Sequence, residues 1–115
     1  MGPLEFTRIT RDVFRNRAGL LEVLERNNPG RPIQLPNIDF ARREIYLVAA
    51  GPRSSTGYAL EIVRVRDEGD HIVVVVHERT PSLADPVQAR VTYPFALISL
   101  PRNKEPVKLK WPGRP

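Results

Sequence analysis

The sequence contains no cysteine and few histidine or aromatic residues. Its 115 residues include two His, and Phe, Trp and Tyr together make up 7% of the chain. The absence of Cys excludes a thiol nucleophile, a thiolate metal ligand and a disulfide. No apolar run reaches the roughly 18 residues that a membrane-spanning helix needs. The length fits one domain, large enough to bury a core without a metal or a crosslink.

Positive charge is in excess and is mostly carried by arginine. Lys and Arg number 18 against 13 Asp and Glu, which gives a net charge of +5, and fifteen of the basic residues are Arg. Guanidinium groups suit bidentate contact with carboxylate or phosphate. The one local concentration is the tail 102–115, with five basic residues against Glu105. Lys108 and Lys110 could contact phosphates there and Trp111 could stack on a base, so a nucleic-acid-binding module stays open as an alternative.

Proline and glycine divide the chain into short elements. Twelve Pro and seven Gly are spread along the sequence, which favours short strands and one helix over long helices. The pattern "RAGLLEVLER" predicts a helix from residue 17 that "NNPG" ends at residues 27–30. Apolar alternation or short apolar runs predict strands at residues 11–14, 43–50, 58–66, 71–79, 87–93, 94–100 and 106–111.

These elements predict a mainly β domain of the α+β class. We expect a small antiparallel β-sandwich or rolled sheet of about six strands, with one short N-terminal helix packed on it. "DEGD" predicts a hairpin turn, and the run "IVVVV" predicts a central strand covered on both faces. The segment 106–111 predicts a half-buried edge strand with a basic outer face and Trp111 in the core. We divide the chain into an irregular segment 1–12, a single domain 13–111 and a tail 112–115.

The segment Gly51–Tyr58, "GPRSSTGY", raises the question of catalysis. Its hydroxyl residues 54–56 would need a nearby base to act as nucleophiles. His71 and His77 share one predicted strand at a separation of about 20 Å, too far apart for a common metal or proton relay. "RDEGD" lacks the ligand pattern of a calcium loop. We therefore expect no enzyme, no metal site and no cofactor.

The same segment is better suited to binding. Gly57 is expected to supply a positive φ for the turn, but Arg53 and three hydroxyls exceed what a hairpin needs. Asp39 is expected to accept backbone N–H bonds at a separate turn, with a salt bridge to an Arg as the alternative. The predicted partner-binding residues are Arg53, Ser54, Ser55, Thr56, Gly57 and Tyr58, flanked by Tyr93 and Phe95 of the "TYPF" turn.

The order of these signals from Val13 onward resembles the PrcB carboxy-terminal domain family, named for a subunit of a bacterial surface protease complex. The resemblance rests on "GLLEVLE", "LPNIDF", "GPRSSTGYALEI", "HIVVVVHE", "TPSLADPVQARVTYPF" and "ALISLPR". Arg53, Thr56, Gly57 and Tyr58 match the family's loop, whereas Ser54 and Ser55 depart from it. The resemblance implies a small β domain without established catalytic residues that accompanies or assembles with other proteins, such as a protease.

Two further points follow from resemblance. The family implies export or a place in the cell envelope, although Met1–Arg8 contains no apolar core of a signal peptide. "SSTGY" is also similar to the Thr-Thr-Gly-Tyr loop of chagasin-type cysteine-protease inhibitors, which enters a protease cleft. The resulting hypothesis is a non-enzymatic protein-interaction domain that binds through Gly51–Tyr58. A protease inhibitor and a nucleic-acid-binding module remain the alternatives, and the oligomeric state stays open.

Overall fold

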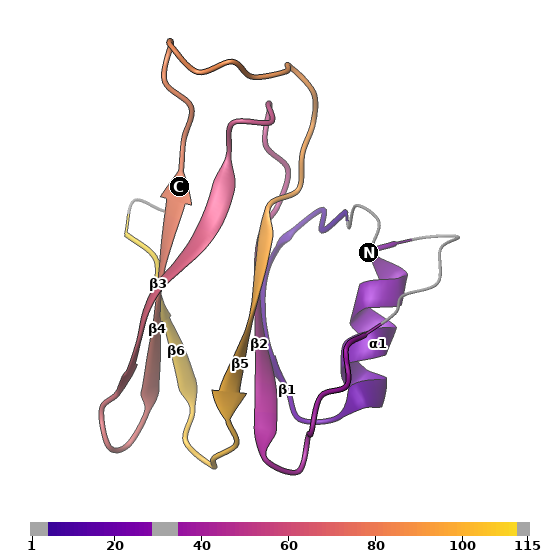
Figure 1. Cartoon of the computed structure of the whole chain (residues 1–115), viewed down its shortest axis with the longest axis vertical. Coiled ribbons are helices and arrows are strands. Elements are labelled where there is room, and N and C mark those ends of the chain that lie inside the picture. The colour runs from indigo at the N-terminus through magenta and orange to yellow at the C-terminus, as the bar shows by residue number, and fades with distance from the viewer. Residues whose placement is uncertain (1–4, 29–34, 113–115) are drawn as a thin grey trace.

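The computed structural model describes residues 5–28 and 35–112, which form six β-strands and one helix (Figure 1). In chain order these are β1 (Ile9–Phe14), α1 (Arg17–Arg26), β2 (Arg43–Ala50), β3 (Ala59–Asp67), β4 (Ile72–Arg79), β5 (Phe95–Pro101) and β6 (Val107–Lys110).

The strands pair into two three-stranded sheets. The first sheet has the order β1-β2-β5 and is antiparallel throughout, and the second has the order β3-β4-β6. The predicted mainly β fold with one short helix is therefore confirmed. One pair differs from the antiparallel expectation, because β6 runs parallel to β4. The link 102–106 returns the chain beside the start of β4, where the Ile72 amide donates to the Pro106 carbonyl at 2.9 Å.

The central strand β2 is the most deeply buried of the described strands and is covered on both faces. Its odd-numbered residues Ile45, Leu47 and Ala49 pack toward α1, and its even-numbered residues pack toward the second sheet (Figure 1). The prediction assigned this place to "IVVVV" in β4. In the structure β4 is central in its own sheet, but its outer face is not covered by another layer of the described chain, and Val75 is half-buried. Replacing a buried side chain of β2, such as that of Leu47, with Ala would lower the free energy of unfolding by about 2–5 kcal/mol.

The helix begins and docks as its sequence predicts. Asn16 caps it by accepting the Gly19 amide at 2.7 Å, which satisfies one of the unpaired donors of the first turn. Leu20 and Leu24 are its buried residues and join the core on the first sheet. The predicted stop at Pro29 and Gly30 lies outside the described residues.

The predicted strand at residues 87–93 is wrong. This stretch is an exposed connection between β4 and β5, and its backbone pairing with another segment is a single bridge between Thr92 and Arg53. Alternation alone does not make a strand where no neighbouring strand offers a ladder. The other predicted strands match those of the structure within about two residues, and Trp111 is buried in the core beside the edge strand β6.

Candidate functional site

The sandwich has two chemically different ends. We call the end that carries residues 51–58 and 80–94 the loop end, and the end that carries the connections 39–42, 67–71 and 102–106 the turn end. Strand β2 runs from the turn end to the loop end, so both are fixed to one buried element (Figure 1). The predicted binding residues all lie at the loop end.

Arg53 holds the loop end together. Its Nε and Nη2 donate to both carboxylate oxygens of Glu78, at 2.6 Å and 3.0 Å, and only 16% of the Arg53 side chain and 10% of the Glu78 side chain are exposed. This hydrogen-bonded pair raises the pKa of Arg53. Nη1 also donates to the carbonyls of Ala50 and Pro52. A bidentate pair that is largely buried fixes the orientation of the loop relative to β4.

Two hydroxyls of the loop are used for bracing. The Ser55 Oγ accepts the Gly57 amide at 3.2 Å, and the Ser55 carbonyl accepts the Thr92 hydroxyl at 2.7 Å. Thr56 and Gln88 exchange two bonds, one in each direction, at 3.1 Å and 2.9 Å. The loop is therefore cross-linked to the connection 80–94 rather than standing free as a tip.

Gly57 serves packing, not an unusual backbone angle. The expectation of a positive φ is wrong, because among the described residues this region holds only Gly51 in that conformation, at φ 80°. A Cβ added at Gly57 would lie 2.5 Å from the Pro81 Cβ and 2.7 Å from a Val87 methyl. Glycine is therefore needed here because the connection 80–94 lies directly on the loop backbone.

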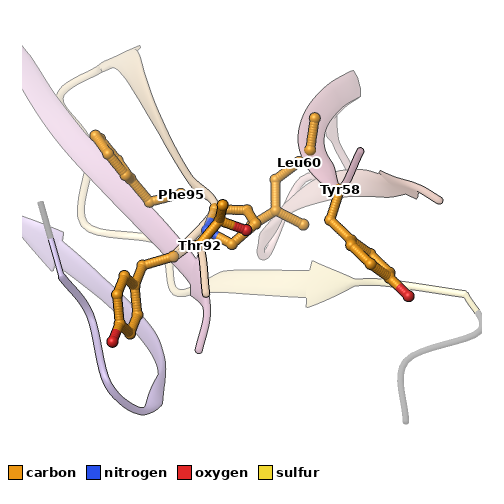
Figure 2. A pocket seen from close by; sticks show the side chains of 7 residues that line it. Tyr58, Leu60, Thr92 and Phe95 are labelled. Atoms are coloured by element: carbon orange, nitrogen blue, oxygen red, sulfur yellow. The ribbon is translucent and has the colours of Figure 1, made fainter. Parts of the chain in front are cut away.

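The braced loop leaves a small hollow between β3 and β5. It has a volume of about 290 Å³ and is lined by Tyr58, Ala59, Leu60, Thr92, Tyr93, Pro94 and Phe95. Figure 2 shows Leu60 and Thr92 lying between Tyr58 on one side and Phe95 on the other. The Phe95 ring is anchored against Phe6, with ring centroids 5.4 Å apart. The structure thus brings together aromatic residues from two segments that the sequence analysis named separately.

The predicted binding residues now fall into two groups. Arg53 and Ser55 point inward and hold the loop, Thr56 is bonded to Gln88, and Ser54 is exposed. The half-buried Tyr58, Tyr93 and Phe95 form the hollow. Glu78 was missed, although a signal existed in the sequence. It lies on the same alternating face of β4 as the buried Val74 and Val76, where a carboxylate requires a cationic partner.

The other polar residues considered from the sequence lie away from the loop end or have structural partners. Asp39 Oδ1 accepts the Ala41 amide at 3.1 Å, as predicted for a turn. His71 contacts Asp70 at 2.6 Å at the turn end, and this hydrogen bond lowers the pKa of Asp70. His77 is exposed on β4.

Across the described ranges, no group of three His, Asp or Glu side chains is placed to hold a metal ion. Of the helical segments described, none has the length and apolar character to cross a membrane.

Comparison with known proteins confirms the resemblance. Residues 45–101 match the family model described as PrcB C-terminal. No curated protein and no solved structure matched the chain significantly. The match runs from within β2 to the end of β5, so it contains the loop end, whereas β1, α1 and β6 lie outside it. Residues 45–101 of this chain therefore carry the sequence pattern of the PrcB C-terminal family.

Proposed function

We propose that this chain is a non-enzymatic accessory domain that binds another protein, such as a protease, through the hollow at the loop end. The family match suggests a protease-associated accessory domain. The observation that carries the proposal is the contrast within the loop. Arg53, Ser55 and Thr56 brace it, while Tyr58 and Tyr93 remain half-buried around an open hollow. Rigid aromatic side chains at a partly exposed site are the usual anchors of protein interfaces.

The hydrogen bonds of the loop support a role other than catalysis. The Ser55 and Thr56 hydroxyls accept backbone amides of Gly57 and Gln88. Of the two His residues, His71 lies at the turn end and His77 pairs across the sheet with Glu61. A nucleophile needs a base within hydrogen-bond reach, and these positions do not bring one to the hydroxyls. Binding is the activity that this arrangement supports best.

The proposal is tested by capturing partners with matched variants. Tyr58→Ala/Tyr93→Ala removes the aromatic walls and leaves the Arg53–Glu78 pair intact. Val63→Ala/Val65→Ala removes comparable exposed apolar surface from β3, outside the hollow. Both variants are checked for folding by circular dichroism and used with the unchanged chain as bait for envelope and soluble fractions. We expect the same protein to be captured by the unchanged chain and the β3 variant, and to be lost from the hollow variant.

Capture by the folded hollow variant at an unchanged level would contradict the proposal. If the captured protein is a protease, its cleavage of a peptide substrate is then measured with and without the chain. An accessory domain leaves cleavage unchanged or raises it, whereas the alternative of an inhibitor predicts that cleavage stops. The bracing of Thr56 and Gly57 by residues 81–88 favours the first result, because these two residues do not form a free wedge.

A further inference from the structure

A second concave surface lies at the turn end and is basic. One hollow of about 530 Å³, which we call the turn hollow, is lined by Arg15, Ala41, Arg42, Arg102, Asn103 and Lys104. No acidic side chain is among the described residues that line it. Arg102 is held in place by donating to the Phe40 carbonyl at 2.6 Å. Cations that converge on one hollow repel one another. An anionic ligand in the hollow would relieve that repulsion, so such a hollow attracts anions.

A neighbouring hollow continues this surface along the open side of the sandwich. It has a volume of about 600 Å³, lies between β1 and β6, and we call it the edge hollow. Arg11 and Lys108 supply charge on its two walls, and Val107 and Leu109 supply apolar surface. Arg15 lines both hollows, so they adjoin at this residue. We refer to the two hollows together as the basic groove.

Much of the basic charge in the groove has no ion-pair partner, although Arg42 lies 3.7 Å from Asp39, which is outside the lining. Asp12 is the one acidic residue among the described residues of its lining, and its Oδ1 accepts the Val13 amide of its own strand. Glu44 pairs with Arg15 at 3.3 Å but is itself fully buried beneath the surface. Lys104 and Lys108 are exposed, and neither forms an ion pair with a described residue.

The β1 wall of the groove has a regular chemical pattern. Arg11 and Val13 face the second sheet in register with Val48 and Tyr46, and Arg15 continues the same alternation just past the end of β1. The wall therefore presents a cation, an apolar residue and a cation at intervals of about 7 Å. An extended peptide presents alternate side chains at the same interval. A peptide complementary to the β1 wall would therefore carry an acidic, an apolar and an acidic residue at alternate positions.

We propose that the basic groove binds an extended acidic segment of a protein, with carboxylates against Arg11, Arg15 and the lysines and an apolar side chain against Val13 and Leu109. This surface is independent of the hollow at the loop end, and occupation of both would let the domain link two protein segments. Burial raises the pKa of the Tyr46 phenol at the edge hollow.

The composition of the groove favours a peptide over a nucleic acid. Single-stranded nucleic acids are bound by cations together with aromatic faces on which bases stack. The aromatic residue lining the edge hollow is Tyr46, which is 2% exposed, and Trp111 is also buried in the core. The edge hollow instead combines the basic residues Arg11, Arg15 and Lys108 with aliphatic side chains, and Asp12 is the one acidic residue of its described lining. Carboxylates alternating with aliphatic side chains match that surface better than phosphates and bases do.

The test measures binding of a fluorescent peptide by anisotropy at fixed salt. The probe peptide carries Glu, Leu and Glu at alternate positions, and a second peptide of the same composition carries the two Glu next to each other. Lys104→Glu/Lys108→Glu reverses one charge in each hollow. Arg79→Glu/Arg90→Glu makes the same change in net charge outside the groove, since neither residue lines it. If the charge-reversed variant Lys104→Glu/Lys108→Glu does not fold, the neutral variant Lys104→Gln/Lys108→Gln is measured in its place.

We expect the alternating peptide to bind the unchanged chain and the control variant similarly, and the groove variant at least about tenfold more weakly. The peptide with adjacent Glu should bind more weakly than the alternating one. Equal weakening in the control variant, or equal binding of the two peptides, would show that only net charge matters and would overturn the proposal. Tighter binding of a single-stranded thymidine oligonucleotide than of the alternating peptide would overturn it in favour of nucleic acid.

Discussion

The two ends of the sandwich use arginine for opposite purposes. At the loop end the Arg53 side chain is 16% exposed and bidentate to Glu78, whereas at the turn end the Arg42 side chain is 86% exposed and 3.7 Å from a largely exposed Asp39. The loop end thereby becomes rigid and presents aromatic side chains, and the turn end keeps free positive charge. Burial and a matched carboxylate, more than residue type, decide whether an arginine stabilises a fold or remains available to a ligand.

Removing the arginine at each end is the sharpest way to test this difference. Arg53→Ala leaves Glu78 buried without its partner, and we expect the free energy of unfolding to fall by about 3 kcal/mol. Arg42→Ala should change it by less than about 0.5 kcal/mol, because the pair is exposed and screened. Urea unfolding followed by circular dichroism measures both. If the two substitutions lowered the free energy of unfolding by the same amount, the proposed difference between the two ends would be contradicted.

Gly57→Ala tests how tightly the loop end is packed. Its Cβ would collide with Pro81 and Val87, so the connection 80–94 has to move away from the loop. We expect a loss of about 2 kcal/mol in unfolding free energy. Gly69→Ala does not serve as a matched control, because Gly69 has a positive φ of 94°. Combining Gly57→Ala with Pro81→Gly, which removes the nearest atom, the Pro81 Cβ, should restore part of the loss, and failure of any rescue would argue against the close contact.

Glu44→Gln tests the one buried carboxylate of the turn end. Glu44 Oε1 accepts from the half-exposed Arg15 and the Asn103 amide, and Oε2 has no hydrogen-bond partner among the described residues. An amide keeps an acceptor oxygen but loses the charge attraction, so a loss of about 1 kcal/mol is expected. Denaturant unfolding measures it. A loss as large as that of Arg53→Ala would mean that the turn end is braced by its ion pair in the same way.

The smallest expected effect concerns Asp70 at the turn end. Its hydrogen bond with His71 lowers the pKa of the carboxyl in the folded state. The contribution to stability is therefore present above the unfolded-state pKa and is lost as the pH falls through the folded-state value. Because the carboxyl is exposed, an NMR titration of Asp70 is the suitable measurement. His71→Ala should move the midpoint up toward the ordinary value, and an unchanged midpoint would contradict the assigned cause.

The elements that the sequence predicts well are those with strong local patterns. The segment 43–50 is predicted with its observed bounds because its apolar residues are continuous, and the hairpin at Gly69 is predicted from the local chemistry of "DEGD". The deep burial of both faces of β2 depends on where the helix docks, and no local sequence pattern contains that information. The segment 87–93 alternates like a strand, but its neighbour is the loop 51–58, with which it forms a single β-bridge at Thr92 and no continuous ladder.

The candidate site is predicted only in part, because some of its contacts join residues that are far apart in the sequence. Tyr58, Tyr93 and Phe95 were named from two separate stretches, and the structure places them around one hollow. The inward direction of Arg53 could not be predicted, because its partner Glu78 lies 25 residues away and is brought near by the register of β3 and β4. The basic groove likewise joins residues 11–15 to residues 102–109, which meet only through the packing of the two sheets.

The most direct test of the loop end as the partner-binding surface is site-specific photocrosslinking. A photoreactive aromatic residue replaces Tyr58 in the hollow and, in a matched variant, Val63 on the exposed surface of β3. Both variants are irradiated in the fraction from which the unchanged chain captures its partner. We predict a covalent adduct with that partner from position 58 and none from position 63. An adduct from position 63 without one from position 58 would contradict the assignment of the binding surface.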